Sequence, residues 1–331
     1  MVNPLINSLK RIRGVRALND RLTKMPGLKH IYRPVREILL PPQAKHRWLI
    51  HDWVADSLSF ARREKLMEFS LTPEGAYVKA CDGIQYWYDL DHPVGGLHGI
   101  VQGDPAVGSE LDLILRNLNP GAVFFDIGAG IGEYALNVAT KVPGSYVPCF
   151  EPTPETWQCV SRNIKRNGLS DRITLHQLAL SDSEGEMAIA PVSQGCFILR
   201  SDNMDLSQYT THTRVKVTTI DKFIRDQNLT QVDFIKADVE GAELFLLKGA
   251  EGCLREHKPH LQLELVEYCA QRLGYTVGDI FKYLAGLGYS CVTMVNDQGE
   301  IVRLDAGESV PSMLDRALNF FFCHQSKTFS I

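Results

Sequence analysis

Two carboxylates and a run of alternating glycines stand out near the middle of the 331-residue chain. Asp126 and Glu151 each end a short apolar run, and Gly128, Gly130 and Gly132 lie between them. Glycines let a ligand approach the backbone closely, and a carboxylate at the end of the second strand can accept both hydroxyls of a ribose. The spacing therefore predicts a site for a cofactor that contains a nucleoside.

The residue after the last glycine separates two classes of cofactor. A dinucleotide-binding loop has the pattern Gly-x-Gly-x-x-Gly, and Glu133 occupies the place of its third glycine. A carboxylate at the start of the following helix would repel a pyrophosphate, whereas the cationic sulfonium and ammonium of S-adenosylmethionine suit it. We therefore expect S-adenosylmethionine, and a nicotinamide oxidoreductase is the disfavoured alternative.

A second acidic cluster follows a later apolar run. Asp238 and Glu240 come directly after this run, and Glu243 is three residues further on. Methylation of a hydroxyl needs an oxygen aligned with the methyl carbon and a group that takes the proton. We expect Asp238 to be that base and to lie beside the cofactor, with Glu240 and Glu243 as orienting groups. The alternative is a helix start that simply favours acidic residues, and the role of Lys236 stays open.

A polar segment at 191–213 could fold over the site as a lid. It contains His212, which we name as a further candidate catalytic residue, with a solvated loop histidine as the alternative. The cysteines and histidines show no zinc-type spacing, so we expect no metal site.

The elements that position these residues alternate between strands and helices. Thr153 and Pro154 mark the start of one helix and Gly168 marks its end. Strands separated by helices imply a mainly parallel sheet covered on both faces. The predicted sheet strands are 123–126, 145–151, 173–179, 234–238, 260–265, 290–295 and 317–323. Further short strands are predicted at 187–190 and 215–218, and helices at 109–118, 132–140, 154–167, 219–225, 241–249 and 277–287.

Seven blocks of residues resemble the FkbM-type methyltransferases over roughly 105–325. The most specific block is 235–243, in which Lys, Asp and Glu alternate before Gly-Ala-Glu; the others are 126–133, 150–154, 163–168, 217–221, 247–250 and 263–264. The resemblance implies an α/β, Rossmann-like class I methyltransferase fold with a seven-stranded, mainly parallel sheet whose last strand is antiparallel. It also implies methyl transfer to a hydroxyl of a sugar, glycolipid or polyketide-type metabolite.

The same resemblance implies which residues line the cofactor. Asp182 or its neighbouring backbone would lie beside the adenine, and Ala237 departs from the larger aliphatic residue that is common in the family. The expected cofactor contacts are Asp126, Gly128, Ala129, Gly130, Gly132, Glu133, Tyr134, Glu151, Pro152, Ala179, Leu180, Ser181, Asp182 and Asp238.

Residues 1–104 form a predicted extension to a methyltransferase domain at 105–331. Residues 1–50 hold eleven Lys and Arg against two acidic residues. We expect helices over the first 70 residues and a β-rich lead-in from about 69 to 101. This extension could contact substrate, a second copy of the chain, a membrane surface or an anionic carrier.

Composition and charge disfavour other functions. The net charge of −4 opposes a specific nucleic-acid binder, and the Asn/Asp-Pro-Pro-aromatic segment common in nucleobase methylation is absent. The eight scattered cysteines are expected to be free thiols in a reducing cytoplasm, and no 18-residue apolar stretch occurs. We therefore expect a cytoplasmic enzyme with a small-molecule or glycan acceptor. The alternatives are a nucleic-acid or protein N-methyltransferase that uses the basic N-terminus, and a non-catalytic binding module.

Overall fold

The computed structural model describes residues 66–72, 75–80, 82–88, 105–189, 198–199, 213–302, 304 and 309–331. The chain divides into two compact units, residues 1–62 and 63–331, and all described residues belong to the second. The basic segment 1–50, His212 and nearly all of the predicted lid lie outside the described residues. The predictions made for them stay predictions.

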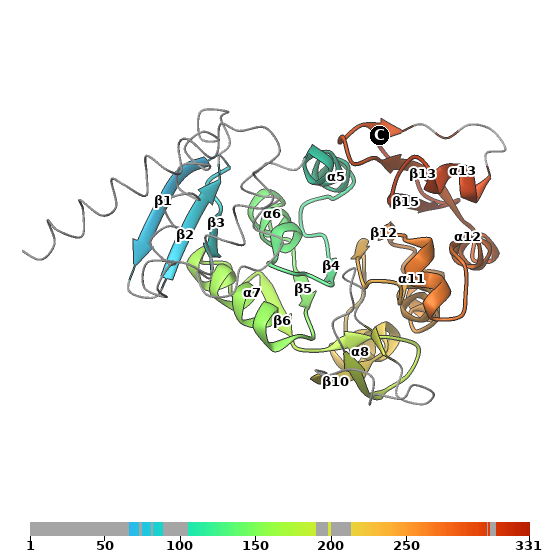
Figure 1. Ribbon diagram of the computed structural model, residues 1–331, viewed down its shortest axis with the longest axis horizontal. Helices are drawn as coiled ribbons and strands as arrows, with labels where there is room; N and C mark the ends of the chain where they lie inside the picture. Colours follow the sequence, from blue (N-terminus) through green and yellow to red (C-terminus); the bar gives the residue numbers. More distant parts are fainter. Residues whose placement is uncertain are drawn as a thin grey trace, which may run out of the picture. The chain divides into compact units, whose positions relative to one another are not determined.

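An eight-stranded sheet forms the centre of the second unit (Figure 1), in the order β14-β13-β15-β12-β11-β4-β5-β6. Strands β12, β11, β4, β5 and β6 are parallel, and β15 is antiparallel to both of its neighbours. This confirms the seven predicted strands and the antiparallel last one, and β14 adds an eighth. The strands are β4 (Phe124–Ile127), β5 (Val147–Phe150), β6 (Ile173–His176), β11 (Phe234–Ala237), β12 (His260–Glu264), β13 (Tyr289–Val295), β14 (Ile301–Val302) and β15 (Asn319–His324).

Most residues of the central strands are apolar and buried, as in a sheet that is covered on both faces, and Asp126, Lys236 and Gln262 are buried polar exceptions. In β4, for example, the successive residues Phe124 and Phe125 are both fully buried. The helices are α5 (Pro105–Arg116), α6 (Glu133–Lys141), α7 (Pro154–Arg166), α8 (Ile220–Asp226), α9 (Glu243–Lys248), α10 (Glu251–Glu256), α11 (Glu267–Arg272), α12 (Val277–Gly286) and α13 (Val310–Leu314). The sequence did not predict α10, α11 and α13, whereas the predicted helix at 241–249 corresponds to the shorter α9.

A second sheet of four strands has the order β7-β10-β8-β9. Its strands are β7 (Ala179–Leu180), β8 (Gly185–Ile189), β9 (Ile198–Leu199) and β10 (Thr213–Thr218). β10 pairs parallel with β7 and antiparallel with β8, so the two short predicted strands are neighbours. This pairing fixes the segment that follows β6, since the Ser181 N–H donates to the Thr218 carbonyl at 3.0 Å.

An antiparallel three-stranded sheet, β1 (Leu66–Thr72), β2 (Gly75–Ala80) and β3 (Gln85–Tyr88), precedes α5. It confirms the predicted β-rich lead-in. The prediction of a helix up to residue 70 is wrong for 66–70, which belong to β1. Apolar and polar residues alternate from Met67 to Thr72, and this period of two is that of a strand.

Two asparagine side chains, Asn163 on α7 and Asn167 directly after it, form hydrogen bonds with the backbone of β3. Asn167 accepts from the Gln85 N–H at 2.8 Å and donates to the Gln85 carbonyl at 2.6 Å. Asn163, which is fully buried, accepts from the Trp87 N–H and donates to the Ile131 carbonyl at 2.9 Å. Asn163 therefore joins β3 to the loop between β4 and α6.

The cysteines differ in part from the expectation of free thiols. Cys149, Cys159, Cys253, Cys291 and Cys323 are free. Cys269 is disulfide-bonded, so the expectation is wrong for this residue. The spacing of cysteines along a sequence does not reveal which distant cysteines pair, so the sequence could not predict this disulfide.

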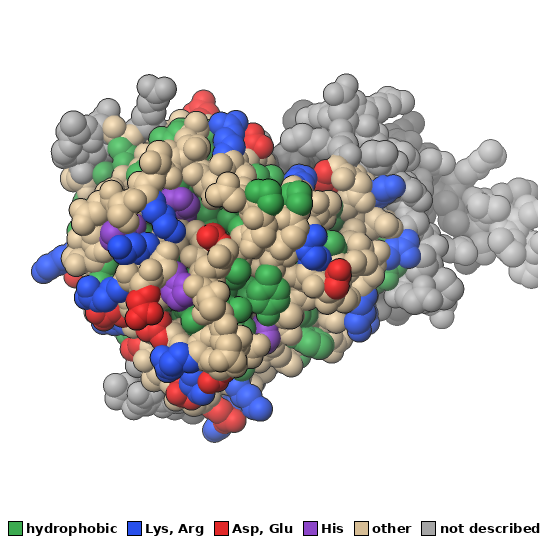
Figure 2. Space-filling model, turned by 180° about the vertical axis from the view of Figure 1, so that it is seen from behind, with side chains coloured by type: hydrophobic (Ala, Val, Ile, Leu, Met, Phe, Trp, Pro, Cys, Tyr) green, Lys and Arg blue, Asp and Glu red, His purple; other side chains and the backbone are tan. Residues whose placement is uncertain are grey.

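The molecular surface mixes charges of both signs. On the face in Figure 2, basic and acidic side chains lie next to one another rather than in separate patches. Among the described residues, ion pairs between positions four residues apart on a helix include Lys222 with Asp226 and Arg255 with Glu251, each at 2.8 Å. Within the described ranges, no helix is both long and apolar enough to cross a membrane.

Candidate active site

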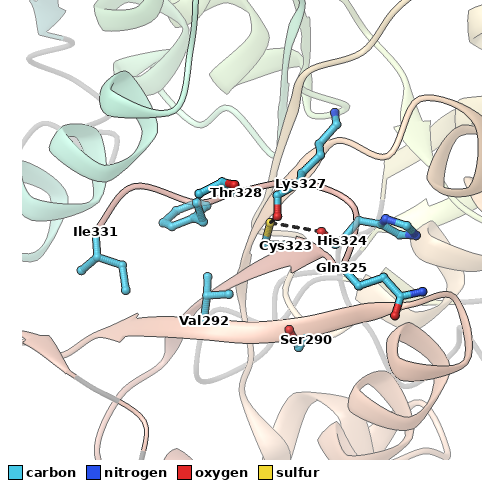
Figure 3. A pocket seen from close by; sticks show the side chains of 9 residues that line it. Ser290, Val292, Cys323, His324, Gln325, Lys327, Thr328 and Ile331 are labelled. Atoms are coloured by element: carbon cyan, nitrogen blue, oxygen red, sulfur yellow. Dashed lines mark hydrogen bonds between the residues drawn. The ribbon is translucent and has the colours of Figure 1, made fainter.

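A pocket of about 400 Å³ lies at one edge of the central sheet (Figure 3). Its lining includes Ser290 at the start of β13, His324 at the end of β15, and Lys327 beyond it. Because β15 runs antiparallel to β12, its end lies at the amino edge of the parallel strands. Ligands of such sheets bind at the carboxyl edge, so this pocket is separate from the residues that the sequence singles out.

At the carboxyl edge, the loop from β4 to α6 turns through three glycines with left-handed φ values. Gly128, Gly130 and Gly132 have φ of 71°, 56° and 84°. A Cβ on Gly128 would overlap the carbonyl oxygen of Asp238, so the loop passes directly against the end of β11. A Cβ on Gly130 would meet nothing within 4 Å. The glycine loop is therefore closed towards β11 and open at Gly130, as a cofactor cradle requires.

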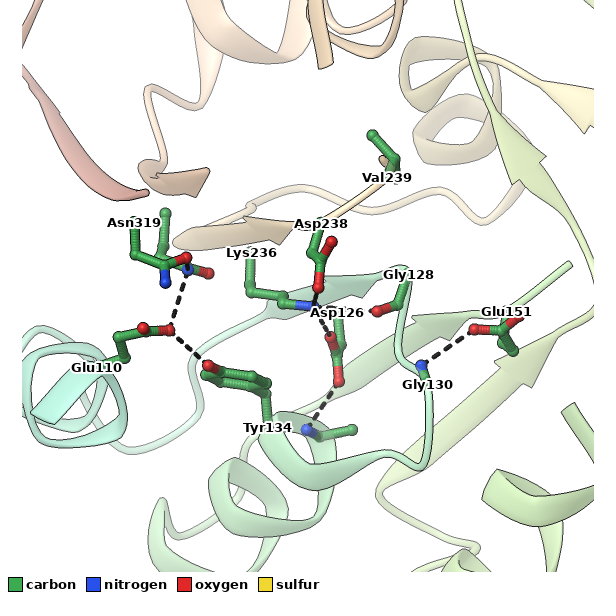
Figure 4. A network of polar contacts seen from close by, with 12 residues as sticks. Glu110, Asp126, Gly128, Gly130, Tyr134, Glu151, Lys236, Asp238, Val239 and Asn319 are labelled. Carbon is green, nitrogen blue, oxygen red and sulfur yellow. Dashed lines mark hydrogen bonds and ion pairs between the residues drawn. The ribbon is translucent and has the colours of Figure 1, made fainter. Parts of the chain in front are cut away.

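Glu151 follows β5 and lies against the glycine loop. Its Oε2 accepts from the Gly130 N–H at 3.0 Å (Figure 4), and the residue is 6% exposed. Its Oε1 accepts from the Thr153 N–H at 3.1 Å and from the hydroxyls of Thr153 and Thr156 at 2.6 and 2.7 Å. Thr153 occupies the predicted N-cap position of α7, but its side chain makes no cap hydrogen bond. These hydroxyls fix the Glu151 carboxylate beside Gly130.

Asp126, at the end of the predicted first strand, is completely buried. Its Oδ2 accepts from the Ala135 N–H at 2.9 Å, and its Oδ1 lies 3.8 Å from the Lys236 ammonium. Burial raises the pKa of Asp126, and the charge of Lys236 and the Ala135 hydrogen bond oppose that rise. Its visible role is to shape the start of α6 and to pair with Lys236, while contact with a cofactor stays a prediction.

Lys236 lies at the centre of the polar network in Figure 4. Its side chain is 4% exposed, and its Nζ donates to the Gly128 carbonyl at 3.0 Å. The same Nζ lies 3.8 Å from Asp126 Oδ1 and 3.7 Å from Asp238 Oδ2, and 5.0 Å from the centre of the Tyr134 ring. Lys236 is thus a residue of the site, a role that the sequence left open.

The ammonium of Lys236 stays charged despite its burial. Burial by itself lowers the pKa of a lysine, but the negative charges of Asp238 and Asp126 outweigh it here and raise the pKa of Lys236. Glu264 and Glu110 add to this rise. The site therefore contains a permanent buried cation surrounded by carboxyl groups.

Glu264 ends β12, beside Asp238, because Leu263 pairs with Ala237 in the parallel register. The charge of Asp238, followed by burial and a hydrogen bond with Asp238, raises the pKa of Glu264 far above its usual range. Glu264 and Asp238 therefore form a hydrogen-bonded acidic pair at the ends of neighbouring strands. The sequence contained it only in a family block, and its place at a strand end next to β11 was the available signal.

Glu110 on α5 is a further acidic residue that sequence reasoning missed. It is 1% exposed, and its Oε2 accepts from the Tyr134 hydroxyl and, at 3.2 Å, from Gln262 Nε2. It lies on the same helical face as the fully buried Leu113 and Ile114. A carboxylate on an apolar face was the signal that could have found it.

Glu240 and Glu243 lie in the turn from β11 to α9. Glu240 has a left-handed φ of 55°, and burial, together with the charges of Asp238 and Glu243, raises its pKa to about 7. Glu243 is 2% exposed and accepts from the N–H groups of Gly241 at 3.1 Å and Val239 at 3.3 Å. Burial raises its pKa to about 7 as well. Glu243 thus stabilises the turn through these hydrogen bonds. This agrees with the orienting role that the sequence suggested for it.

The segment predicted to lie beside the adenine follows β6. Ala179, Leu180 and Ser181 are buried, and Asp182 is partly exposed. A Cβ on Gly249 would overlap the Ser181 carbonyl oxygen, so the end of α9 packs directly on this segment. Groups of three or more potential metal ligands do not occur among the residues described.

Comparison with known proteins assigns these residues to one family. The family model described as "Methyltransferase FkbM domain" matches residues 126–291. The chain belongs to the FkbM methyltransferase family. The FkbM domain begins at Asp126 and contains the glycine loop, Glu151, Lys236, Asp238 and Glu264, whereas Glu110 precedes it. Its fold is the α/β fold of class I methyltransferases, as the sheet order indicates.

The chain is similar to three curated methyltransferases. Methyltransferase 1 of Beauveria bassiana is 29% identical over 44% of this chain and 63% of its own length. Hexuronic acid methyltransferase AglP of Haloferax volcanii is 27% identical over 43% of this chain and 56% of its own length. 2-O-methyltransferase NoeI of Sinorhizobium fredii is 28% identical over 41% of this chain and 60% of its own length. The chain thus spans less than two thirds of the length of each of these relatives.

S-adenosylmethionine is the cofactor of the FkbM family, and the residues at the carboxyl edge fit it. Gly130 faces open space, and Glu151 is fixed beside it with its carboxylate turned to the loop. The surrounding side chains are mainly acidic, which suits a cofactor with a positive sulfonium and ammonium. The first strand end, the glycine loop and Asp238 are brought together as the sequence predicts.

Proposed function

We propose that this chain transfers the methyl group of S-adenosylmethionine to a hydroxyl of a sugar, glycolipid or polyketide-type acceptor, with Asp238 as the base. The observation that supports this most is the position of Asp238. Its backbone touches the glycine loop at Gly128, and its side chain is 37% exposed. The neighbouring Asp126 and Lys236 are almost completely buried. Asp238 is thus a carboxylate that lies against the cofactor loop and reaches solvent.

S-adenosylmethionine supplies an electrophilic methyl group when it is bound. The protein then has to align an acceptor oxygen with that methyl group and to receive the hydroxyl proton. The Lys236 ammonium lies 3.7 Å from the Asp238 carboxylate, and Glu264 shares a hydrogen bond with it. The carboxylate can accept the hydroxyl proton as the carbon–oxygen bond forms and the bond between the methyl group and sulfur breaks.

The names of two relatives support a hydroxyl acceptor on a sugar. One is a 2-O-methyltransferase, and the other acts on a hexuronic acid. From these two names we propose the same class of acceptor for this chain, a sugar or related metabolite that bears a hydroxyl.

Labelled S-adenosylmethionine, incubated with fractionated glycans, glycolipids and small metabolites, tests the acceptor class. We expect label in an O-methyl group, located by mass spectrometry. Incorporation only into nucleic acid or protein nitrogen would contradict the proposal. A folded protein that binds S-adenosylhomocysteine but labels no fraction would favour the non-catalytic alternative.

A further inference from the structure

Lys236 contacts parts of the site that come from different elements. Its ammonium donates to the Gly128 carbonyl, which belongs to the glycine loop after β4. It also pairs with Asp126 at 3.8 Å and with Asp238, beyond the end of its own strand β11, at 3.7 Å. One buried cation therefore touches both the loop of the cofactor and the carboxylate proposed as the base.

The contact between the loop and β11 makes this bridge a close one. Gly128 approaches the Asp238 backbone so tightly that a side chain would not fit, and its own carbonyl accepts from Lys236. A movement of the ammonium would therefore displace Gly128, Asp238 or both. Buried charges persist in proteins only where such partners compensate the loss of hydration.

The titratable groups around this ammonium come from five elements. Asp126 lies on β4, Glu110 on α5, Tyr134 on α6, Asp238 after β11 and Glu264 on β12. Glu240 and Glu243 face Asp238 from the following turn. Four acidic groups thus act on one cation, and its removal would leave their repulsion uncompensated.

We propose that Lys236 is a positioning residue that links the cofactor loop to the proton-accepting carboxylate. It holds Gly128 in the conformation that S-adenosylmethionine needs, and its ion pair holds the Asp238 carboxylate beside the glycine loop. The second half rests on the proposed function, because it takes Asp238 to be the base. The first half depends only on cofactor binding.

Lys236→Met tests both halves, since methionine has a similar length and no charge. We expect the Kd for S-adenosylhomocysteine, measured by calorimetry, to rise about tenfold or more, because a hydrogen bond from a charged donor is lost. We also expect the acidic limb of the pH profile of kcat to move up by about one unit, because the carboxylate loses its cation. Lys248→Met, on the exposed side of α9, is the matched control and should change neither quantity.

A folded Lys236→Met protein with unchanged Kd and unchanged pH limb would overturn the proposal. A purely structural role would lower stability without moving the pH limb. If Lys236→Met does not fold, Lys236→Arg replaces it: the charge remains while the geometry changes. For this variant we expect weaker S-adenosylhomocysteine binding with the acidic limb in place, and unchanged binding would overturn the proposal. The effect on Kd tests the loop even if Asp238 proves not to be the base.

Discussion

Gly128 and Asp238 touch through their backbones, although 110 residues separate them along the chain. The contact exists because β4 and β11 are parallel neighbours, with Ile127 opposite Ala237. The glycine loop and the acidic turn leave the sheet side by side at this point. The cofactor loop and the proposed base are therefore held together by backbone packing.

Gly128→Ala should damage this contact. The new Cβ would overlap the Asp238 carbonyl, and the φ of 71° is unfavourable for an L side chain. We expect a loss of about 1–2 kcal/mol from the φ strain and about 1–3 kcal/mol more from the overlap, measured by urea unfolding. Gly83→Ala is the control, since Gly83 has a φ of 88° with nothing within 4 Å. Equal losses in the two variants would argue against the tight contact.

Glu151→Gln should weaken cofactor binding. The substitution removes the charge that would accept the ribose hydroxyls, and the single amide oxygen can accept from Gly130 or from Thr153, but not from both. We expect the Kd for S-adenosylhomocysteine to rise by roughly 10- to 100-fold, as for a hydrogen bond to a charged group. The exposed Glu155 on the first turn of α7 provides the control, Glu155→Gln. An unchanged Kd in Glu151→Gln would exclude Glu151 as the ribose ligand.

The architecture could be predicted because apolar runs and helix-limiting residues are visible locally in the sequence. The strands of the central sheet are short and mainly apolar, since most of their residues are buried, and Pro154 and Gly168 mark the limits of α7. The site was predicted where residues follow strand ends directly, as for Asp126 and Asp238. It is these residues that the parallel strands bring to one edge.

The other residues of the site depend on pairings that one sequence does not display. The register of β12 against β11 places Glu264 beside Asp238. Glu110 reaches the site only because α5 packs beside α6. The role of Lys236 depends on the loop that folds over it. The functions of segment 1–50 and of His212 stay predictions, since both lie outside the described residues.

Asn163 and Asn167 should differ in their effect on the cofactor. Asn167→Ala removes the partner of Gln85, so we expect a loss of about 1–3 kcal/mol in the free energy of unfolding. Asn163→Ala should cost a similar amount and should also raise the Kd for S-adenosylhomocysteine, because it releases the Ile131 carbonyl of the loop. Urea unfolding and calorimetry on both variants check this. A raised Kd in Asn167→Ala alone would contradict the assignment.

Glu243 should make the protein less stable as the pH rises. Its pKa is about 7 in the folded state against an ordinary value of 4.5, so the folded state binds more protons between these two pH values. Stability from this group is complete below pH 4.5 and is lost as the pH rises to about 7, by at most about 3 kcal/mol. Glu243→Gln should reduce the decline in urea titrations from pH 4.5 to 7.5, and the part that remains is expected from Glu240, whose pKa is also about 7. The exposed Glu256→Gln is the control, and an unchanged pH slope in Glu243→Gln would contradict the assignment.

The turnover number of Asp238→Asn, with cofactor and identified acceptor at saturation, tests the role of Asp238 as the base. Asparagine keeps the shape of the side chain and cannot take the hydroxyl proton. We predict that kcat falls by about 10²- to 10⁴-fold in a variant whose urea midpoint shows that it is folded, while Glu256→Gln keeps the wild-type rate. A kcat equal to that of the wild type would contradict the role of Asp238 as the base.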